Sequence, residues 1–413
     1  MMVRQDSVCG SRTTGSRRQA RRNSGSAIVL FLGVDTRGSS AIDAFPCWSS
    51  ILGLDAAVEG VDLPLDSADA DYRLFIDGVR GSTDVRGAVV TAHKANLFHA
   101  ARELVDEVRD DAVRCREISV LGRDGAFLFA DAIDVASIRA ALAEMLRQGF
   151  PPNADVICLG AGATATALMV ALLDRDSCAG VRPRRVIATD VCPSRLERLR
   201  HVVSELAPAL PLELRLTAAE EPPIGDLADI AVGSLIVNAT GLGKDRPGAP
   251  VRLPARWPDE AVVWDLNYRG ALPFLHDAAR QADRRGLRVH DGWSLFIHGW
   301  TEALAAIFAR PVTENERNRM RAAAERARRW HLGRACAGLW GLSARPLLPA
   351  FLAQPPHAMD PSRCRATCAH GWLIEGAFVP VAERLAFLAL ARVLRRRGRS
   401  RRCRLLESAR RPL

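Results

Sequence analysis

The chain has 413 residues, 48% of them hydrophobic and 25% charged, an ordinary balance for a globular protein of two domains. Its formal charge is +10, and arginines crowd its two ends, where we expect solvated tails rather than a nucleic-acid site. No apolar run reaches the roughly 18 residues of a membrane span, so the composition argues against a membrane protein.

The first half of the chain alternates strand and helix patterns after a basic arm, residues 1–27, that we expect to be disordered. Strands are predicted at Ala27–Val34, Ala57–Leu63 and Gly87–Thr91, and helices at Ile42–Leu52, His93–Val108 and Val135–Gln148. Between the last two helices, a hairpin is predicted from Glu117–Leu121 and Ala126–Phe129. Asp134 is well placed as the N-cap of the helix that follows it. The alternation predicts an α/β domain over residues 28–148.

The second half shows the same alternation more regularly. Strands are predicted at Asp155–Leu159, Arg185–Thr189, Leu212–Leu216, Leu235–Thr240, Ala261–Leu266 and Leu287–His290. Helices are predicted at Thr166–Leu173, Pro193–Leu206, Leu272–Arg285 and Trp293–Phe308. We therefore predict a second α/β domain, of the Rossmann type, over residues 151–310. Residues 311–413 begin with a charged helix and continue as an Arg-rich, irregular extension without an assigned role.

The cysteine pattern favours a reducing compartment. Ten cysteines are scattered along the chain, and the short apolar run at Ala27–Gly33 is better explained as a strand than as a signal peptide. Cys364, Cys368 and His370 have the spacing of half a metal site but lack a convincing second pair. We expect a cytoplasmic protein without a bound metal.

The segment Gly160–Ala165 carries the strongest chemical signal, because it follows a predicted strand and opens a predicted helix. Gly160 permits a tight turn, and Gly162 lets the backbone approach a pyrophosphate. Ala163 stands at the helix N-terminus, and Ala165 keeps helix and strand close. This context predicts a dinucleotide site.

Asp190 ends the second strand of the same unit. A carboxylate there accepts hydrogen bonds from the ribose hydroxyls of NAD and repels the 2′-phosphate of NADP. No cation follows immediately, although Arg195 is near. We therefore expect NAD or NADP as the cofactor and favour NAD; the alternative is a purely structural role for Asp190 at the start of a helix.

Three segments of the second half, Val237–Gly243, Asp265–Tyr268 and Asp291–Phe296, resemble the shikimate/quinate dehydrogenase family in order and spacing. The family carries an Asn-Ala-Thr-x-x-Gly loop, an Asp-x-x-Tyr strand end and a late glycine before a hydrophobic helix. The resemblance implies an NAD(P)-dependent oxidoreductase that interconverts a cyclic hydroxy-acid and its keto form. It also implies that the last helix packs on the first domain. The cofactor loop that it implies contains Asn238, Thr240 and Gly243.

The first half matches the family's substrate site in part. Ala88–Lys94 resembles its Asn-Val-Thr-x-Pro-x-Lys segment, which places Lys94 as the catalytic lysine. Asp134 stands in the place of its aspartate partner, with Asp131 as a competing candidate. The substrate-binding residues that the resemblance implies are Ser39, Ser40, Thr91 and Tyr268.

The paired lysine and aspartate suit the removal of a hydroxyl proton as hydride leaves the carbon, or its return in the opposite direction. The family's last helix supplies a glutamine to the substrate, whereas this chain has Gly299 there, with His298 as a candidate substitute. Shikimate, quinate and related polyol carboxylates are therefore equally admissible substrates.

Two other interpretations remain open: a related Rossmann enzyme such as a glutamyl-tRNA reductase-like protein, and a dinucleotide-binding regulator that contacts nucleic acid through its basic ends. We expect a small-molecule partner rather than a nucleic acid, and we leave a homodimer open.

Overall fold

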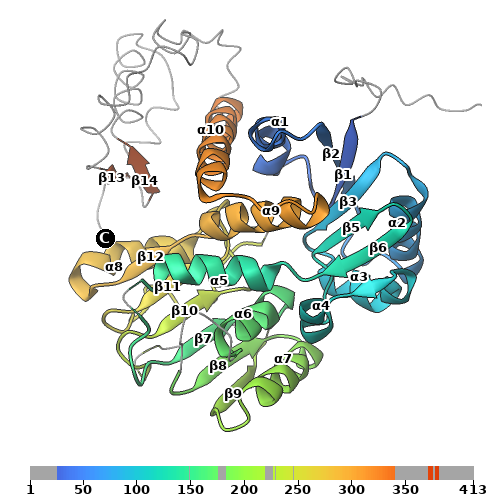
Figure 1. The fold of residues 1–413 in the computed structure, drawn as a ribbon. Coiled ribbons are helices and arrows are strands. Elements are labelled where there is room, and N and C mark those ends of the chain that lie inside the picture. Colours follow the sequence, from blue (N-terminus) through green and yellow to red (C-terminus); the bar gives the residue numbers. More distant parts are fainter. Residues whose placement is uncertain are drawn as a thin grey trace, which may run out of the picture. The chain divides into compact units, whose positions relative to one another are not determined.

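The computed structural model describes residues 26–147, 149–174, 183–218, 227, 229–244, 246–339, 371–374 and 377–380 (Figure 1). These residues belong to two compact units: unit 1 contains residues up to Asp134 together with Ile297–His331, and unit 2 contains Val135–Phe296 and the residues after His331. The predicted basic arm up to residue 25, the Arg-rich end and the Cys364–His370 segment lie outside the described residues.

Unit 1 is built on a mixed six-stranded sheet in the order β2-β1-β3-β5-β6-β4 (Figure 1). Its first three strands are parallel, and β5 pairs antiparallel with both β3 and β6. The strands are β1 (Ala27–Gly33), β2 (Ala56–Asp62), β3 (Val85–Val90), β4 (Glu107–Val108), β5 (Val120–Asp124) and β6 (Phe127–Asp131). The helical segments are α1 (Ser40–Leu52), α2 (Asp69–Gly81), α3 (Lys94–Ala101), the 3-10 turn η1 (Arg102–Leu104) and α4 (Asp110–Cys115).

Side chains from two segments far apart in the sequence build one part of the core of unit 1. Trp300 of α9 (Trp293–Ile307) packs against Phe31 and Trp48, with ring centroids 5.2 and 5.5 Å away. The Trp48 indole N–H donates to the Met320 carbonyl of α10 (Glu314–Leu339) at 2.9 Å. The last helix of the predicted Rossmann half therefore packs on the N-terminal sheet, as the resemblance implies.

Two helices of unit 1 are absent from the predicted elements, α2 and α4. The predicted helix His93–Val108 is wrong beyond Ala101, because the chain turns through η1 and then pairs as β4 with β6. The Asp106 carboxylate accepts the Leu128 N–H of β6 at 2.7 Å and holds this segment at the sheet edge. The competition between helix propensity and strand pairing is decided here by the long-range contact.

Unit 2 is built on a parallel sheet in the order β12-β11-β10-β7-β8-β9 (Figure 1). In chain order this is the doubly wound arrangement, which reverses direction between β7 and β10. The strands are β7 (Val156–Leu159), β8 (Val186–Asp190), β9 (Leu212–Leu216), β10 (Leu235–Asn238), β11 (Val262–Asp265) and β12 (Arg288–His290). The helices are α5 (Asp134–Met145), α6 (Ala163–Leu173), α7 (Pro193–Leu206) and α8 (Pro273–Arg285).

These strands form where buried apolar runs are bounded by turns. All four residues of β7, β10 and β11 are buried, as expected of central strands covered on both faces. Every residue from Ala165 to Leu173 is buried as well, so α6 is the central helix of unit 2.

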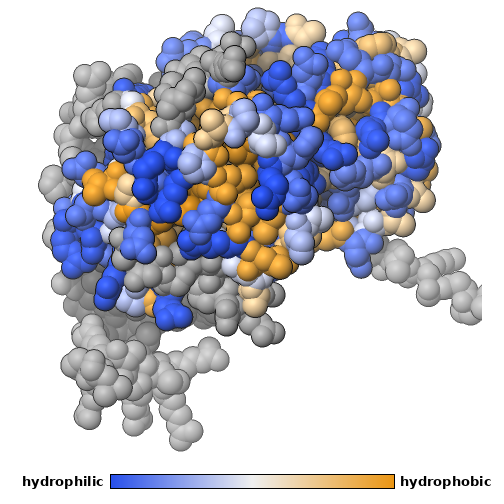
Figure 2. Space-filling model, turned by 90° about the horizontal axis from the view of Figure 1, so that it is seen from below, coloured by the Kyte–Doolittle hydropathy of each residue, from blue (hydrophilic) through white to orange (hydrophobic). Residues whose placement is uncertain are grey.

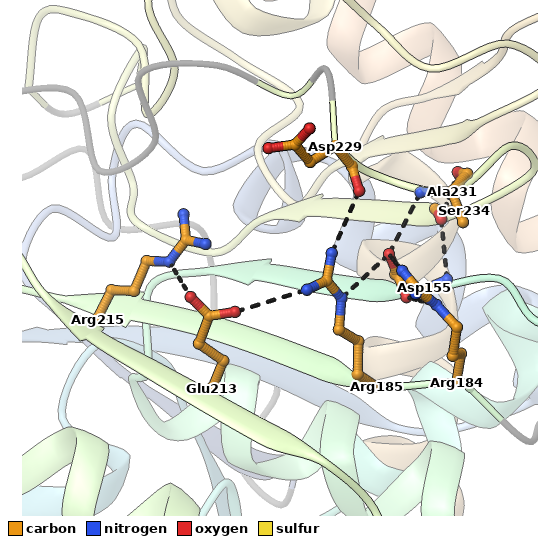
Figure 3. Close-up of polar contacts among 8 residues, drawn as sticks. All are labelled: Asp155, Arg184, Arg185, Glu213, Arg215, Asp229, Ala231 and Ser234. Carbon is orange, nitrogen blue, oxygen red and sulfur yellow. Dashed lines mark hydrogen bonds and ion pairs between the residues drawn. The ribbon is translucent and has the colours of Figure 1, made fainter.

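A buried carboxylate joins the leading ends of the strands of unit 2 (Figure 3). The Asp155 carboxylate, fully buried, accepts two hydrogen bonds from the Arg184 guanidinium at 2.9 and 2.8 Å and lies 3.3 Å from the Arg185 Nε. The carboxylate also accepts the Ala231 N–H at 3.3 Å. The backbone N–H of Asp155 donates to the Ser234 hydroxyl at 2.9 Å. Two arginine side chains before β8 and a backbone N–H before β10 therefore share the carboxylate that precedes β7.

The view from below shows hydrophobic residues in patches between hydrophilic ones rather than in one continuous band (Figure 2). Among the described helices, none combines the length and the apolar character that a membrane crossing would require. Two further strands, β13 (Gly371–Ile374) and β14 (Ala377–Pro380), form an antiparallel pair to which we assign no role.

Candidate functional site

Lys94 and Asp134 form an ion pair although 40 residues separate them in the chain. Lys94 is the first residue of α3, and Asp134 is the first residue of α5. The prediction that Asp134 is the N-cap, the residue just before the helix, is therefore off by one position. Their side chains are only 13% and 12% exposed. The fold thus holds one amine and one carboxylate together with partial access to solvent.

The competing candidate, Asp131, is engaged elsewhere. One of its carboxylate oxygens lies 3.3 Å from the Arg109 guanidinium, and the other accepts the Ala132 N–H at 2.8 Å. The structure therefore pairs Lys94 with Asp134.

The electrostatic surroundings of Lys94 favour its charged form. Burial lowers the pKa of the amine, but the carboxylates of Asp134 and Glu117 raise it and prevail, so the pKa lies above its ordinary value. At neutral pH Lys94 is an ammonium that can donate a proton.

The loops after β1 and β3 lie against each other near this pair. The Thr91 N–H and hydroxyl both donate to the Leu32 carbonyl, at 3.0 and 3.1 Å. A Cβ on Gly33 would lie 3.0 Å from Thr36 and 3.1 Å from Thr91, so glycine permits this contact. Thr91, one of the predicted substrate residues, therefore lies three positions before Lys94. It packs against the loop after β1, which contains Thr36.

Ser39 and Ser40 are both buried at the start of α1. The Ser39 hydroxyl accepts the Ala41 N–H at 3.3 Å and so caps the helix. Because a hydroxyl that accepts one hydrogen bond can still donate another, the cap does not exhaust its capacity.

The glycine turn of unit 2 lies at the reversal point of the sheet. Gly160 has a φ of 100°, and a Cβ on it would lie 2.8 Å from the Ala239 backbone, so the loops after β7 and β10 meet there. A Cβ on Gly162, the N-cap of α6, would meet nothing within 4 Å. The N–H groups in the first turn of a helix have no acceptor within the helix, so the start of α6 at Ala163, beside this open space, suits a pyrophosphate.

Asp190, at the end of β8, closes the other side of the turn. Its carboxylate accepts the Ala161 N–H at 2.8 Å and the Cys192 N–H at 2.9 Å. The N-cap of α7 is Cys192, so the alternative interpretation, in which Asp190 caps this helix, does not hold. Arg195 lies 3.7 Å from the same carboxylate.

A compact polar cluster joins the loop after β10 to the end of β11. The Asn238 amide donates to the Asp265 carboxylate at 3.1 Å and its oxygen accepts the Thr240 hydroxyl at 2.7 Å. The Asn267 side chain also donates to Asp265, at 2.8 Å. Gly243, with a φ of 86°, closes the loop against Pro273. The buried Asp265 carboxylate thus holds the predicted cofactor residue Asn238, which in turn holds Thr240.

The sequence alone does not indicate a role for Asp265, which ends the buried strand β11. It is fully buried, and burial raises the pKa of its carboxyl to about 6 against the opposing hydrogen bonds from Asn267 and Asn238. The neighbouring Asp291 raises this pKa further. Among the hydrogen bonds of the described residues, none reaches its second oxygen.

We expect Asp265→Asn to flatten the dependence of stability on pH. Because the folded pKa lies above the unfolded one, the contribution of Asp265 to stability falls by roughly 3 kcal/mol as pH rises from about 4 to 6. Chemical denaturation at several pH values tests this. Equal pH slopes for the variant and the wild type in that window would count against a raised Asp265 pKa.

Aromatic rings surround Tyr268 at the end of β11. Its ring centroid lies 5.3 Å from Trp293 and 4.8 Å from Phe296. Further along α9, His298 is only 2% exposed, and a Cβ on Gly299 would meet nothing within 4 Å. A side chain could therefore begin at position 299 without a clash at its Cβ. His93 instead packs inside unit 1, bonded to the Tyr72 hydroxyl and the Leu63 carbonyl.

The described residues bring no three histidine, cysteine or acidic side chains together as a metal site would need. A mixed sheet in unit 1 and a doubly wound parallel sheet with a glycine turn in unit 2 define a two-domain α/β protein with a Rossmann dinucleotide-binding domain.

A comparison with known proteins identifies the family of the chain. The chain is 31% identical to the shikimate dehydrogenase (NADP(+)) of Methylocella silvestris over 280 residues, which cover 66% of this chain and 88% of that one. The chain belongs to the shikimate dehydrogenase family. No protein-family model matches it.

Solved structures share the fold at lower identity. The quinate dehydrogenase of Corynebacterium glutamicum in complex with NAD superimposes with a TM-score of 0.56 at 19% identity, covering 72% of this chain and 98% of that one. The 5-ketofructose reductase of a Gluconobacter species gives 0.54 at 18% identity, covering 74% and 99%.

Proposed function

We propose that the protein is an NAD(P)-dependent oxidoreductase that interconverts a cyclic hydroxy-acid and its keto form. The observation that carries this proposal is the partly buried pair of Lys94 and Asp134. It is supported by the family of the chain and by a turn of unit 2 that suits a pyrophosphate.

Lys94 is the proton donor in the direction of ketone reduction, because its ammonium is the stable form at neutral pH. Asp134 orients the amine and holds its charge beside the substrate oxygen. In the direction of alcohol oxidation Lys94 must first lose its proton, so we expect that direction to gain rate at alkaline pH.

The remaining substrate contacts are Ser39, Ser40, Thr91, Tyr268 and His298, and the catalytic domain is residues 28–148. Hydroxyl groups bind a carboxylate by hydrogen bonds. Gly299 leaves the ring hydroxyls without the family's glutamine, so the choice among shikimate, quinate and related acids rests on the other contacts.

Residues 151–310 bind the dinucleotide, through Gly160, Gly162, Ala163, Ala165, Asp190, Asn238, Thr240 and Gly243. The dinucleotide supplies or accepts a hydride when bound. We propose NAD as the preferred form, because the Asp190 carboxylate lies against the glycine turn where it repels a 2′-phosphate. Relatives named for NADP(+) make this a point to test.

Asp190→Asn should raise the ratio of kcat/KM with NADP to that with NAD by roughly tenfold or more, because a like-charge repulsion of about 1–4 kcal/mol disappears. Steady-state rates with both cofactors measure the ratio. Glu205→Gln, an exposed carboxylate on α7, is the control and should leave the ratio unchanged. An unchanged ratio in Asp190→Asn would remove this residue from cofactor selection.

The proposed activity is tested by incubating the protein with NAD or NADP and a panel of cyclic hydroxy-acids that includes shikimate and quinate. Absorbance of the reduced cofactor should rise with at least one of them. Binding of a dinucleotide without turnover of any acid or of the corresponding ketone would overturn the proposal.

A further inference from the structure

A second carboxylate, Glu117, belongs to the surroundings of Lys94. Its segment is hydrogen-bonded to Lys94 and to the chain that leads to Asp134. The Ile118 N–H donates to the Lys94 carbonyl at 3.0 Å, and the Ser119 N–H donates to the Asp131 carbonyl at 2.9 Å. Glu117 therefore lies in the strip of backbone that joins the two elements carrying the ion pair.

Glu117 is fully buried. An ionised carboxylate is very costly to bury unless a cation or several donors compensate it. Lys94 is the cation that acts on this region: its pKa is lowered by burial and raised, in order, by the carboxylates of Asp134 and Glu117. Two acidic side chains thus act on one ammonium.

We propose that Glu117 is a positioning residue of the Lys94 site, whose buried carboxylate is a second counter-ion that keeps the amine protonated beside Asp134. For catalysis this inference rests on the proposed function; for the titration of Lys94 it does not. Lys94, Asp134 and Glu117 then titrate as one coupled group.

Cys115, which also acts on Lys94, supplies no competing cation. Cys115, at the end of α4, is buried, and burial together with Glu117, Asp111 and Asp134 raises the pKa of its thiol, which therefore stays neutral. Lys94 is the group that acts in the opposite direction on that thiol. The region has an excess of acidic groups, and this excess favours the ammonium form of Lys94.

The sequence makes this proposal measurable without any substrate. The chain contains only two lysines, Lys94 and Lys244. Protein labelled with ¹³C at the lysine Cε positions should give two titrating NMR signals, and Lys244→Arg assigns them. Glu117→Gln should lower the Lys94 pKa by about one pH unit, the usual effect of losing a nearby opposite charge. The exposed Glu107→Gln is the matched control and should leave the signal unchanged.

A second comparison keeps the test decisive if Glu117→Gln folds poorly. In Asp134→Asn, Glu117 remains as a counter-ion, so the Lys94 pKa should stay near or above its ordinary value. In the double variant, burial alone should depress it well below that value. A Lys94 titration that is indifferent to Glu117→Gln, or one that collapses fully in Asp134→Asn alone, overturns the inference.

A kinetic readout separates this inference from the proposed function. The rise of kcat/KM with pH for alcohol oxidation should move to lower pH in Glu117→Gln by the amount that NMR reports for Lys94. If the NMR shift occurs but no cyclic hydroxy-acid is turned over, the proposed function fails and the role of Glu117 stands. If turnover occurs while both profiles are unchanged, the role of Glu117 fails and the function stands.

Discussion

Replacing Lys94 by arginine should lower kcat/KM for the cyclic hydroxy-acid about a hundredfold to ten-thousandfold, the usual contribution of a positioned proton donor. A guanidinium keeps its proton at any pH of interest, so it can pair with Asp134 but cannot give or take the proton of the reacting oxygen. The dissociation constant for NADH should not change, because the proposed dinucleotide site belongs to unit 2. Steady-state rates and fluorescence titration with NADH measure the two quantities.

The control for lost charge is Arg86→Ala, an exposed cation on β3, the strand that leads toward Lys94. This variant should retain its rates. Lys94→Ala should lose turnover as Lys94→Arg does, and it also leaves Asp134 without its cation. If Lys94→Arg kept more than about a tenth of the wild-type kcat/KM, direct proton transfer by this side chain would be refuted.

The composition of the chain also distinguishes Lys94. The chain has 57 lysines and arginines, and all but two are arginine. A surface cation or an ion pair can be made by either residue, but only lysine offers a proton that it can release in a biochemical reaction. A lysine at a partly buried position, paired with a carboxylate, is therefore chemically specific in this sequence.

The parallel sheet of unit 2 could be predicted closely from the sequence. Its strands are short apolar runs bounded by Gly, Pro and charged residues, and α7 and β9 have the predicted bounds. The order of the strands follows from the alternation with helices, because parallel strands need crossover connections. Local sequence patterns are enough to predict an element whose buried residues form one apolar run within the element itself.

Unit 1 shows where local patterns fail. The buried side chains of α2 do recur at helical spacing, as Tyr72, Phe75, Ile76 and Val79, but a high content of aspartate obscures the signal. The segment Glu107–Val108 has no strand character of its own and becomes β4 because β6 offers it partners. Pairing across 22 residues is not visible in a window of ten or fifteen.

The site divides along the same line. The Lys94 and Asp134 pair and the glycine turn were found through residue types at family-like positions. The charges that tune them were not: Glu117 precedes an unremarkable strand, and Asp265 lies in a segment whose family-like residue is Tyr268. A sequence shows that a residue can ionise, whereas burial and neighbours decide at which pH it does so.

Asp155→Ala should cost about 3 kcal/mol of unfolding free energy, the largest loss that we expect from a substitution away from the candidate site. The carboxylate is fully buried, and its removal leaves the Ala231 N–H without its acceptor and two arginines without their shared anion. The cost stays at the lower end for buried pairs because the Arg184 and Arg185 side chains are 47% and 27% exposed and can turn toward water. Chemical denaturation followed by circular dichroism measures the loss.

The pH dependence of Asp155 gives the same prediction a second readout. Burial raises the pKa of this carboxyl, but the hydrogen bonds from Arg184 and Ala231 lower it and prevail, so the folded pKa lies below the unfolded one. The network therefore stabilises the fold above the ordinary aspartate pKa, near 4, and this contribution is lost as pH falls through the folded value. The difference between wild type and Asp155→Ala should accordingly shrink in acid.

An exposed pair supplies the contrast for Asp155. Glu197 and Arg200 on α7 lie 3.1 Å apart with side chains 72% and 55% exposed, so Glu197→Gln should change stability by less than about 0.5 kcal/mol. The two substitutions each remove one carboxylate from an ion pair in the same unit, and they differ in burial and in the number of partners. Equal effects of the two would mean that Asp155 contributes no more than a surface charge, and the network that joins β7, β8 and β10 would then be incidental to the stability of unit 2.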